Sequence, residues 1–298
     1  MNELPGAPKH KDLVYDIGMH KGEDAEFYLR KGFRVVGFEA NPELVAFCKE
    51  RLKEYIVRGK LVIVEGAILP PEEIAAGTKE VTFYKNDDNS VWGTVYLNWA
   101  ERNVQFGTSF SSVTVGVVNF EEVLREHGIP HYMKIDIEGC DMVCLNALKR
   151  FKERPDYLSV ESDKTSLANV EGEIDSLMDL GYDRFQAVDQ SVIAVTQVPP
   201  NPPREGEYAD QRFEHGSSGL FGAELPDDWK AKRAILRQYR VILLGYYLMG
   251  DEGIMRRWKF RGAWRLQRLA QKIFCPFKND LYPWWYDTHA RLSTKAEK

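Results

Sequence analysis

An alternation of buried strands and helices, beginning near the N-terminus, constrains this chain more than any other feature. Residues 12–17, D-L-V-Y-D-I, have the pattern of a buried strand, residues 18–22 form a tight loop, and residues 23–30 form the helix that the loop opens. Residues 33–39 repeat the strand pattern, and Asn41 can cap the helix that follows. Strand, helix, strand and helix in this order predict a βαβ unit with parallel strands.

The same alternation continues toward residue 200, so most of the chain is expected to form one α/β unit. Two further strands are expected around a polar, Trp-bearing insertion, at 79–85 and 112–118. The other expected strands lie at 61–64, 132–137 and 157–161, and the other expected helices at 119–127, 141–151 and 170–178.

Two strand patterns near residue 190 predict the arrangement at one edge of the sheet. Residues 184–188 and 192–196 have the composition of strands, and only three residues separate them. Parallel neighbours need a crossover of about a dozen residues or more, so these two strands must pair antiparallel as a hairpin. The predicted fold is therefore α/β, with a Rossmann-like sheet that is mostly parallel and ends in an antiparallel hairpin.

Four prolines in residues 198–204, V-P-P-N-P-P-R, predict a stiff, extended linker after this unit. We expect a first domain over residues 1–200 and a basic, aromatic-rich helical extension over 201–298. Amphipathic patterns predict two helices in the extension, over 228–249 and 252–274.

The extension differs from the rest of the chain in charge. The whole sequence has a net charge of −5, yet residues 229–298 hold 7 Lys and 9 Arg against 3 Asp and 2 Glu, which gives +11 and leaves −16 for the remainder. Basic residues there are interleaved with Trp and Phe, and an aromatic stretch with Tyr and Trp follows them. We favour packing on the acidic domain or a homodimer contact, then contact with an anionic membrane face, and RNA binding last.

The loop from Asp16 to Gly22, D-I-G-M-H-K-G, has the composition of a nucleotide site. Glycines let the backbone approach a ligand closely, and Glu39, which ends the next strand, can accept both hydroxyls of a ribose. Dinucleotide-binding loops usually begin with Gly, whereas Asp16 repels phosphate and can receive the ammonium group of a methionine-like tail. The acid at this position favours S-adenosylmethionine over NAD. A glycine loop without such an acid would more simply be an ordinary turn between a strand and a helix.

Three acids follow two central strands at their carboxyl ends, which form the ligand edge of a parallel sheet. Asp136 and Glu138 lie in K-I-D-I-E-G-C-D, and Glu161 ends the next strand. We expect at least one of them to act in catalysis or substrate binding, with an ion pair to Lys134 as the plainer alternative. Their oxygen atoms would suit Mg²⁺, but nothing in the sequence requires a metal, and none is predicted.

The motifs D-I-G-x-x-x-G, F-E-A-N-P and K-I-D-I-E-G-C-D resemble those of the FkbM family of S-adenosylmethionine-dependent methyltransferases. The resemblance covers residues 12 to about 163. It implies a class I methyltransferase fold, S-adenosylmethionine as the cofactor, and O-methylation, commonly of sugar hydroxyls in glycan or natural-product pathways.

The resemblance implies cofactor contacts at Asp16, Gly18 and Glu39 and active-site roles for Asp136 and Glu138. The full set of expected cofactor contacts is Asp16, Gly18, His20, Gly22, Glu39, Ala40, Gly66, Ala67 and Asp136. The expected catalytic residues are His20, Asp136, Glu138 and Glu161.

The chain departs from the family pattern in its motifs. Met19 and His20 replace the usual Ala-Asn, Ala40 replaces Pro, and Asp141 replaces Glu. His20 can act as a base toward the substrate, or it can pack beside the cofactor without a chemical role.

Two loops are expected to contact the acceptor. Residues 86–94, N-D-D-N-S-V-W-G-T, and residues 215–222, H-G-S-S-G-L-F-G, hold aromatic rings and small polar side chains of the kind that bind sugars. The same compositions also suit surface loops with ordinary turns. The expected substrate contacts are Asn89, Ser90, Trp92 and His215.

The sequence therefore predicts a methyltransferase that acts on a hydroxyl of a sugar, glycan or related natural product. A nicotinamide-dependent oxidoreductase and a non-catalytic glycan-binding relative are the alternatives. Residues 1–11 lack the apolar stretch of a secretory signal, the apolar run 241–249 is too short to span a bilayer, and the four cysteines form no C-x-x-C pair. We expect a cytoplasmic protein with buried thiols. If the extension contacts a membrane, the protein would lie peripherally at its inner face.

Overall fold

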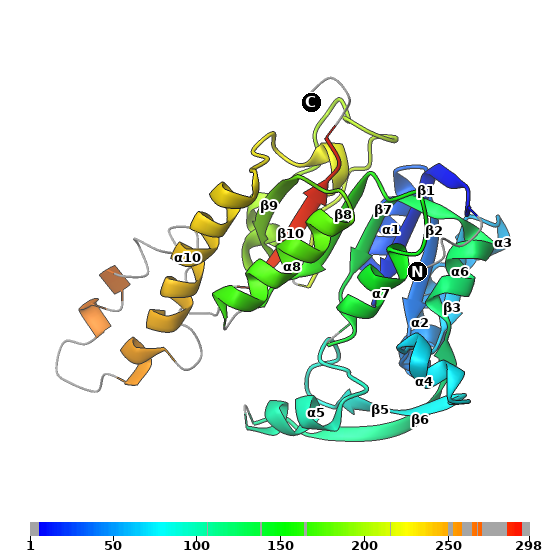
Figure 1. Ribbon diagram of the computed structural model, residues 1–298, viewed down its shortest axis with the longest axis horizontal. Coiled ribbons are helices and arrows are strands. Elements are labelled where there is room, and N and C mark those ends of the chain that lie inside the picture. The colour runs from blue at the N-terminus through cyan, green and yellow to red at the C-terminus, as the bar shows by residue number, and fades with distance from the viewer. Residues whose placement is uncertain are drawn as a thin grey trace. The chain divides into compact units, whose positions relative to one another are not determined.

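The computed structural model describes residues 6–105, 107–137, 139–163, 166–214, 216–249, 253–257, 264–266, 268–269 and 285–293. These residues form two sheets with helices between the strands (Figure 1). The strands of the larger sheet are β1 (Lys9–Ile17), β2 (Arg34–Glu39), β3 (Leu61–Glu65), β7 (Ile129–Ile135), β8 (Tyr157–Glu161), β9 (Arg184–Asp189) and β10 (Tyr286–Arg291). The strands of the smaller sheet are β4 (Ala67–Ile68), β5 (Glu80–Asn86) and β6 (Phe110–Val118).

The helices follow the predicted alternation. The α-helices are α1 (Glu23–Arg30), α2 (Pro42–Arg51), α3 (Lys53–Val57), α4 (Pro71–Ala75), α5 (Leu97–Val104), α6 (Phe120–His127), α7 (Asp141–Leu148), α8 (Leu167–Asp179), α9 (Ile193–Thr196) and α10 (Lys232–Met249). The 3-10 helices are η1 (Gln190–Val192), η2 (Gly222–Glu224) and η3 (Ile254–Arg257).

The larger sheet has the strand order β3-β2-β1-β7-β8-β10-β9, as labelled in Figure 1. β1 pairs in parallel with β2 on one side and β7 on the other, and β3 and β8 continue the parallel arrangement outward. The last five residues of β1 are buried, as expected for a central strand of a parallel sheet. The predicted α/β fold with a mostly parallel, Rossmann-like sheet is confirmed.

The predicted hairpin between residues 184–188 and 192–196 is wrong in its second strand. Residues 192–196 lie in helical turns, because the Asp189 side chain accepts a hydrogen bond from the Ser191 N–H and caps η1, and α9 continues from it. A side chain that caps the first turn gives the backbone a local alternative to strand pairing, and the β-branched composition of this segment did not reveal it.

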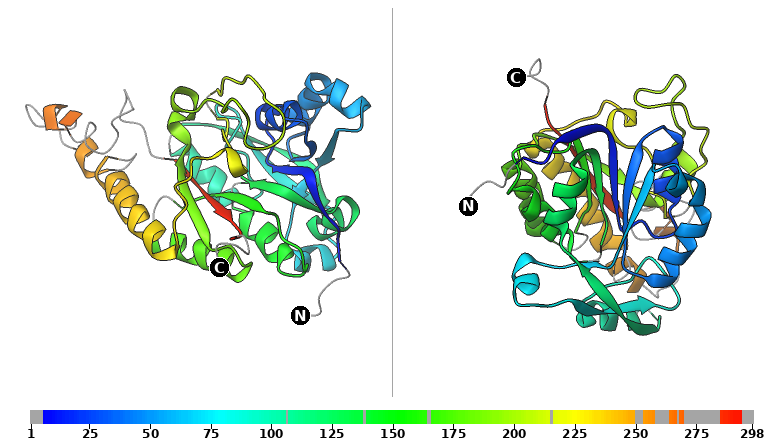
Figure 2. Two further views of the ribbon diagram at one scale, coloured as in Figure 1. Left: turned by 90° about the horizontal axis from the view of Figure 1, so that it is seen from above. Right: turned by 90° about the vertical axis from the view of Figure 1, so that its right-hand side faces the viewer.

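β10, near the end of the chain, is the strand that pairs antiparallel with β9 (Figure 2). Its sequence is Y-D-T-H-A-R, and Asp287, Thr288 and His289 are all buried. Consecutive buried polar residues produce no hydrophobic alternation, so the sequence pattern gave no strand signal there.

The insertion after β3 forms the smaller sheet. β5 and β6 pair antiparallel from Glu80 opposite Gly116 to Asn86 opposite Phe110, and β4 pairs in parallel with β6. Ala67, Phe83 and Val115 form its buried cluster. Both strands expected in this region are confirmed.

The chain divides into two compact units. The first contains Met1–Val160, Pro199–Gln211 and Phe221–Glu224; the second contains Glu161–Val198, Arg212–Leu220 and Leu225–Lys298. The chain thus returns to the first unit twice, over Pro199–Gln211 and over Phe221–Glu224. The domain boundary expected at residue 200 stays a prediction.

Aromatic packing holds Phe221–Glu224 against the rest of the first unit. The Phe221 side chain is fully buried, and its ring centroid lies 4.8 Å from those of both Tyr28 and Tyr132. Close by in sequence, the Glu224 carboxylate accepts a hydrogen bond from the Lys31 ammonium at 2.6 Å, and both side chains are buried. Removing one partner of such a pair would leave an uncompensated buried charge.

In the second unit, α10 confirms the first helix predicted for the extension. Lys232, at its start, forms an ion pair with Asp175 of α8 at 2.5 Å. The second predicted helix, 252–274, lies largely outside the described residues. The proposed membrane and homodimer contacts of the extension therefore stay predictions.

Three of the four cysteines lie in the described residues, and Cys48, Cys140 and Cys144 are buried free thiols, as predicted. Burial raises the pKa of Cys48 to about 12, which keeps its thiol protonated. Across the described ranges, no helix combines the length and the apolar character needed to cross a membrane.

Replacing Phe221 by Ala should lower the free energy of unfolding by about 3–5 kcal/mol, because the substitution leaves a cavity among packed rings. Urea denaturation of the full chain measures this loss. Tyr208→Ala, in the other segment that returns to the first unit and 43% exposed, is the control and should cost less than about 1 kcal/mol. Equal losses for the two variants would show that the segment does not depend on this packing.

Candidate active site

The carboxyl ends of β1, β2 and β7 meet at one edge of the larger sheet. The Gly18 and Met19 N–H groups both donate to the Phe38 carbonyl of β2, at 3.1 and 2.9 Å. The Asp136 N–H donates to the Ile17 carbonyl of β1 at 2.9 Å. The chain leaving β1 is therefore held between the ends of its two neighbours, at the edge where parallel sheets bind ligands.

Gly18 is required by this arrangement. Its φ is +84°, and a Cβ atom there would lie 2.0 Å from the Asp136 carbonyl oxygen. Met19, the next residue, is buried, and a Cβ on Gly37 would lie 2.5 Å from its sulfur atom. The two glycines let the loop pass close to both neighbouring strands.

His20 has a left-handed backbone, with φ of +50°, and a side chain that is 22% exposed. Its Nε2 lies 2.7 Å from the Ser90 Oγ, and its Nδ1 lies 3.5 Å from a carboxylate oxygen of Glu23. An imidazole between a hydroxyl and a carboxylate has the arrangement of a general base with an orienting acid. The structure therefore brings together two predicted site residues, His20 and Ser90, that lie far apart in the sequence.

Glu39 organises the loop at the end of β2. One of its carboxylate oxygens accepts the Asn41 N–H at 2.8 Å, and the other accepts the His20 N–H at 3.0 Å. Burial raises the pKa of Glu39, and these backbone hydrogen bonds oppose the rise. A carboxylate offers about four acceptor positions, so Glu39 retains capacity for the hydroxyls of a ribose.

Asp16, at the end of β1, is fully buried and lies 3.2 Å from the Lys134 ammonium. Lys134 also lies 3.4 Å from Asp24 of α1 and donates to the Gly18 carbonyl at 3.1 Å. The second carboxylate oxygen of Asp16 is buried and has no hydrogen-bond partner among the described residues. Because a buried acceptor without a donor is costly, this oxygen fits a ligand that brings a donor, such as an ammonium group.

Gly66, Ala67 and Ala40, which were expected to contact the cofactor, border the smaller sheet. The Gly66 N–H donates to the Glu39 carbonyl at 3.0 Å, and a Cβ atom on Gly66 would lie 2.4 Å from the Gly116 carbonyl oxygen. Ala67 is buried, and Ala40 packs against the same cluster. These residues continue the chain beside Glu39, so their contact with a cofactor stays a prediction.

The insertion loop is ordered by its own polar side chains. The Asn86 side-chain oxygen accepts the Asn89 N–H at 2.8 Å, and the Trp92 N–H donates to the Asn89 carbonyl at 3.0 Å. Beyond the loop, the Tyr96 ring would lie 3.1 Å from a Cβ on Gly139, in the turn after β7. The insertion therefore contacts the turns at the sheet edge at two places, His20 through Ser90 and Gly139 through Tyr96. Sequence reasoning missed Tyr96, because an isolated tyrosine in a loop carries no signal.

The predicted acids are only partly tested. Asp136 directly follows β7, and its charge helps to raise the pKa of Lys134. Glu161 ends β8 and begins the second unit. Glu138 and His215 lie outside the described residues. Lys134 forms its ion pairs with Asp16 and Asp24.

The carboxylate oxygens of Asp136, Glu138 and Glu161 would suit a metal ion such as Mg²⁺. Among the residues that the structure describes, no group of three or more His, Cys, Asp or Glu side chains is arranged to hold a metal ion. Because Glu138 is not among them, this result leaves the considered site untested.

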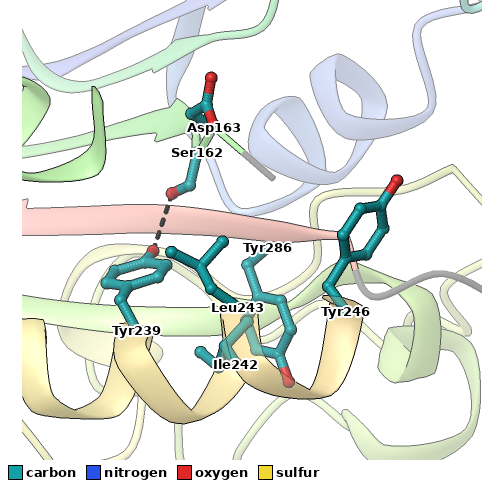
Figure 3. A pocket seen from close by; sticks show the side chains of 7 residues that line it. All are labelled: Ser162, Asp163, Tyr239, Ile242, Leu243, Tyr246 and Tyr286. Atoms are coloured by element: carbon teal, nitrogen blue, oxygen red, sulfur yellow. Dashed lines mark hydrogen bonds between the residues drawn. The ribbon is translucent and has the colours of Figure 1, made fainter. Parts of the chain in front are cut away.

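A small hollow of about 220 Å³, including space open to solvent, lies in the second unit (Figure 3). It is lined by Ser162, Asp163, Tyr239, Ile242, Leu243, Tyr246 and Tyr286. At its base the Ser162 hydroxyl lies 2.7 Å from the Tyr239 hydroxyl and 2.6 Å from the Thr288 hydroxyl. Ser162 directly follows Glu161, so this hollow of aromatic and hydroxyl groups lies just beyond the carboxyl end of β8.

Comparison with protein families gives one match over more than half of the chain. The family described as Methyltransferase FkbM domain matches residues 16–184. This range begins at Asp16 and contains the β1 loop, Glu39, the insertion and Asp136. No curated protein sequence matches the chain.

Solved structures show weaker similarities. A methyltransferase FkbM from Methylobacillus flagellatus KT is 18% identical, with a TM-score of 0.35, and covers 57% of this chain and 38% of that one. An S-adenosylmethionine-dependent methyltransferase from Archaeoglobus fulgidus is 12% identical, with a TM-score of 0.36 and coverage of 95% and 87%. Another from Geobacter sulfurreducens, in complex with S-adenosyl-L-homocysteine, is 10% identical, with a TM-score of 0.34 and coverage of 97% and 86%.

The ionisation of Asp16 should make cofactor binding depend on pH. Burial raises the pKa of Asp16 to about 7, and Lys134 lowers it only in part. Below that pH the carboxyl group is protonated in the free protein, whereas an ammonium group binds to the ionised form. The affinity for S-adenosylhomocysteine should therefore fall by up to tenfold per pH unit below about 7.

Calorimetric titration near pH 8 and near pH 6 measures this dependence. The Asp16→Asn variant should bind more weakly at both values and show little change between them. A pH dependence that the variant retains in full would assign the effect to another group.

Proposed function

We propose an acceptor and a mechanism for this chain, which belongs to the methyltransferase FkbM family and uses S-adenosylmethionine as its methyl donor. We propose that it methylates a hydroxyl oxygen of a sugar, a glycan or a related natural product. The family match favours methyl transfer over the hydride transfer of a nicotinamide-dependent oxidoreductase.

The residues of the β1 loop fit this cofactor. Glu39 has acceptor capacity for ribose hydroxyls, and the unpaired oxygen of Asp16 suits the ammonium group of a methionine tail. Because Gly18 has no side chain, the loop can pass close to the strand ends, where a Cβ atom would collide with the backbone. Bound S-adenosylmethionine supplies an electrophilic methyl group on a sulfonium, so the protein has to align the acceptor oxygen and remove its proton.

The contact between His20 and Ser90 carries the proposal of O-methylation. A hydroxyl oxygen lies 2.7 Å from Nε2, on a side chain that is partly exposed beside the cofactor loop. An acceptor hydroxyl that displaces Ser90 would meet the same nitrogen at hydrogen-bonding distance. In our proposal His20 takes the proton of that hydroxyl through Nε2, and Glu23 stabilises the imidazolium through Nδ1. Asp136 and Glu138 orient the acceptor.

A sugar acceptor is supported by the composition of the insertion loop. Asn89 and Trp92 lie in the loop that carries Ser90, and sugar rings pair hydroxyl groups with amides and apolar faces with aromatic rings.

Replacing His20 by Asn should lower turnover by roughly 10²–10⁴-fold, because the general base is lost while a residue that tolerates the left-handed backbone remains. Release of S-adenosylhomocysteine from S-adenosylmethionine, with a panel of methyl hexopyranosides and deoxyhexopyranosides as acceptors, measures turnover. Binding of S-adenosylhomocysteine should change by less than about threefold, because Glu39 still receives the backbone N–H of residue 20.

Ser90→Ala is the matched control for this prediction. It removes the hydroxyl that occupies Nε2 and leaves the base in place, so turnover should fall far less than in His20→Asn, even though an expected acceptor contact is lost. Full activity in His20→Asn would rule out His20 as the base. Cofactor binding without product from any sugar would argue against this acceptor class, and would favour the non-catalytic alternative if no other hydroxyl acceptor reacts.

A further inference from the structure

Three charged side chains meet beneath the β1 loop, and their charges do not sum to zero. The Lys134 ammonium lies 3.2 Å from Asp16 and 3.4 Å from Asp24, and each of the three side chains is at most 5% exposed. Two carboxylates therefore share one ammonium in a largely buried place. Nearby, Asp136 follows β7, and Glu23 precedes Asp24 in α1; both add further negative charge.

We propose that Asp24 is a positioning residue that determines cofactor specificity: by sharing Lys134 with Asp16, it leaves a net negative charge beneath the loop that selects adenosine ligands with an ammonium group in their tail. The inference rests on S-adenosylmethionine as the cofactor and deepens the proposed function. Asp24 acts through Lys134 and through its field, and needs no contact with the ligand.

The unpaired oxygen of Asp16 is the independent observation that points to a ligand. Lys134 already divides its hydrogen-bonding capacity between Asp16, Asp24 and the Gly18 carbonyl. One carboxylate oxygen of Asp16 consequently remains buried and without a donor among the described residues. A second cation near this oxygen would give two positive charges for two carboxylates, and the buried cluster would become neutral.

The same charge balance explains why Asp24 should matter for specificity. If Asp24 were neutral, Lys134 would compensate Asp16 alone, and the attraction for a further cation would largely disappear. Charges several ångströms apart interact strongly at the low effective dielectric of a buried site. A ligand without an ammonium group would not respond to this change.

The test compares two ligands that share the same nucleoside. S-adenosylhomocysteine carries the amino-acid tail, and 5′-methylthioadenosine ends at the thioether methyl group. Calorimetric titration of the full chain near pH 8 measures both affinities. Asp24→Asn should weaken the binding of S-adenosylhomocysteine roughly ten- to fiftyfold and change the binding of 5′-methylthioadenosine by less than about twofold.

Two control variants separate charge from structure. Glu26→Gln removes a charge from the same helical turn, where Glu26 pairs with Arg51 and not with Lys134, and the ratio of the two affinities should stay unchanged. Asp24→Glu retains the charge and should restore most of the discrimination. Thermal unfolding of each variant without ligand shows whether the fold is intact.

Each outcome decides the question. Equal weakening of both ligands by Asp24→Asn would give Asp24 a purely structural role and overturn the inference, as would an unchanged or increased preference for S-adenosylhomocysteine. If the wild-type chain binds neither ligand, the cofactor assignment itself fails. Binding of both ligands with an unaltered ratio would contradict only the role of Asp24.

Discussion

The ammonium group of Lys134 connects the parts of the chain from which the active site is built. It contacts Asp16 of β1, Asp24 of α1 and the carbonyl of Gly18 in the loop between them, while Lys134 itself belongs to β7. One side chain therefore links two central strands, the first helix and the cofactor loop. Since these groups are buried, each depends on the others for its charge state, and the loop geometry depends on all of them.

Glu39 has the corresponding role on the other side of the loop. Its carboxylate binds the N–H groups of His20 and Asn41, so it fixes both the left-handed turn before α1 and the entry into α2. The residue expected to bind ribose thus also shapes the loop that carries the proposed base. Cofactor binding and base positioning share one carboxylate.

The strands and turns that carry this site were predictable, because local patterns encode them. The β1 loop, the strand that ends at Glu39 and the K-I-D-I-E-G motif were all readable from hydrophobic runs and glycine placement. The contacts between distant segments were not readable. Nothing in either segment indicates that Ser90 reaches His20, or that Asp24 shares Lys134 with Asp16, since such contacts depend on how the sheet brings the segments together.

The edge of the sheet shows the same limit. The prediction of an antiparallel neighbour for β9 was correct, but that neighbour was expected in the next few residues. The actual partner, β10, lies about a hundred residues later and carries buried Asp287 and His289 in place of an apolar pattern. Burial lowers the pKa of His289 to about 3, so its imidazole is neutral inside the sheet.

The central claim is that the loop between Asp16 and Gly22 binds a methyl donor, and ligand-induced stabilisation tests it most directly. Thermal unfolding of the full chain should be measured with S-adenosylmethionine and S-adenosylhomocysteine, each at about a hundred times its expected Kd, and with NAD at the same concentration. The first two should stabilise the fold by roughly 2–3 kcal/mol at that saturation, and NAD should have no effect. Stabilisation by NAD, or none by either adenosyl ligand, would contradict the account.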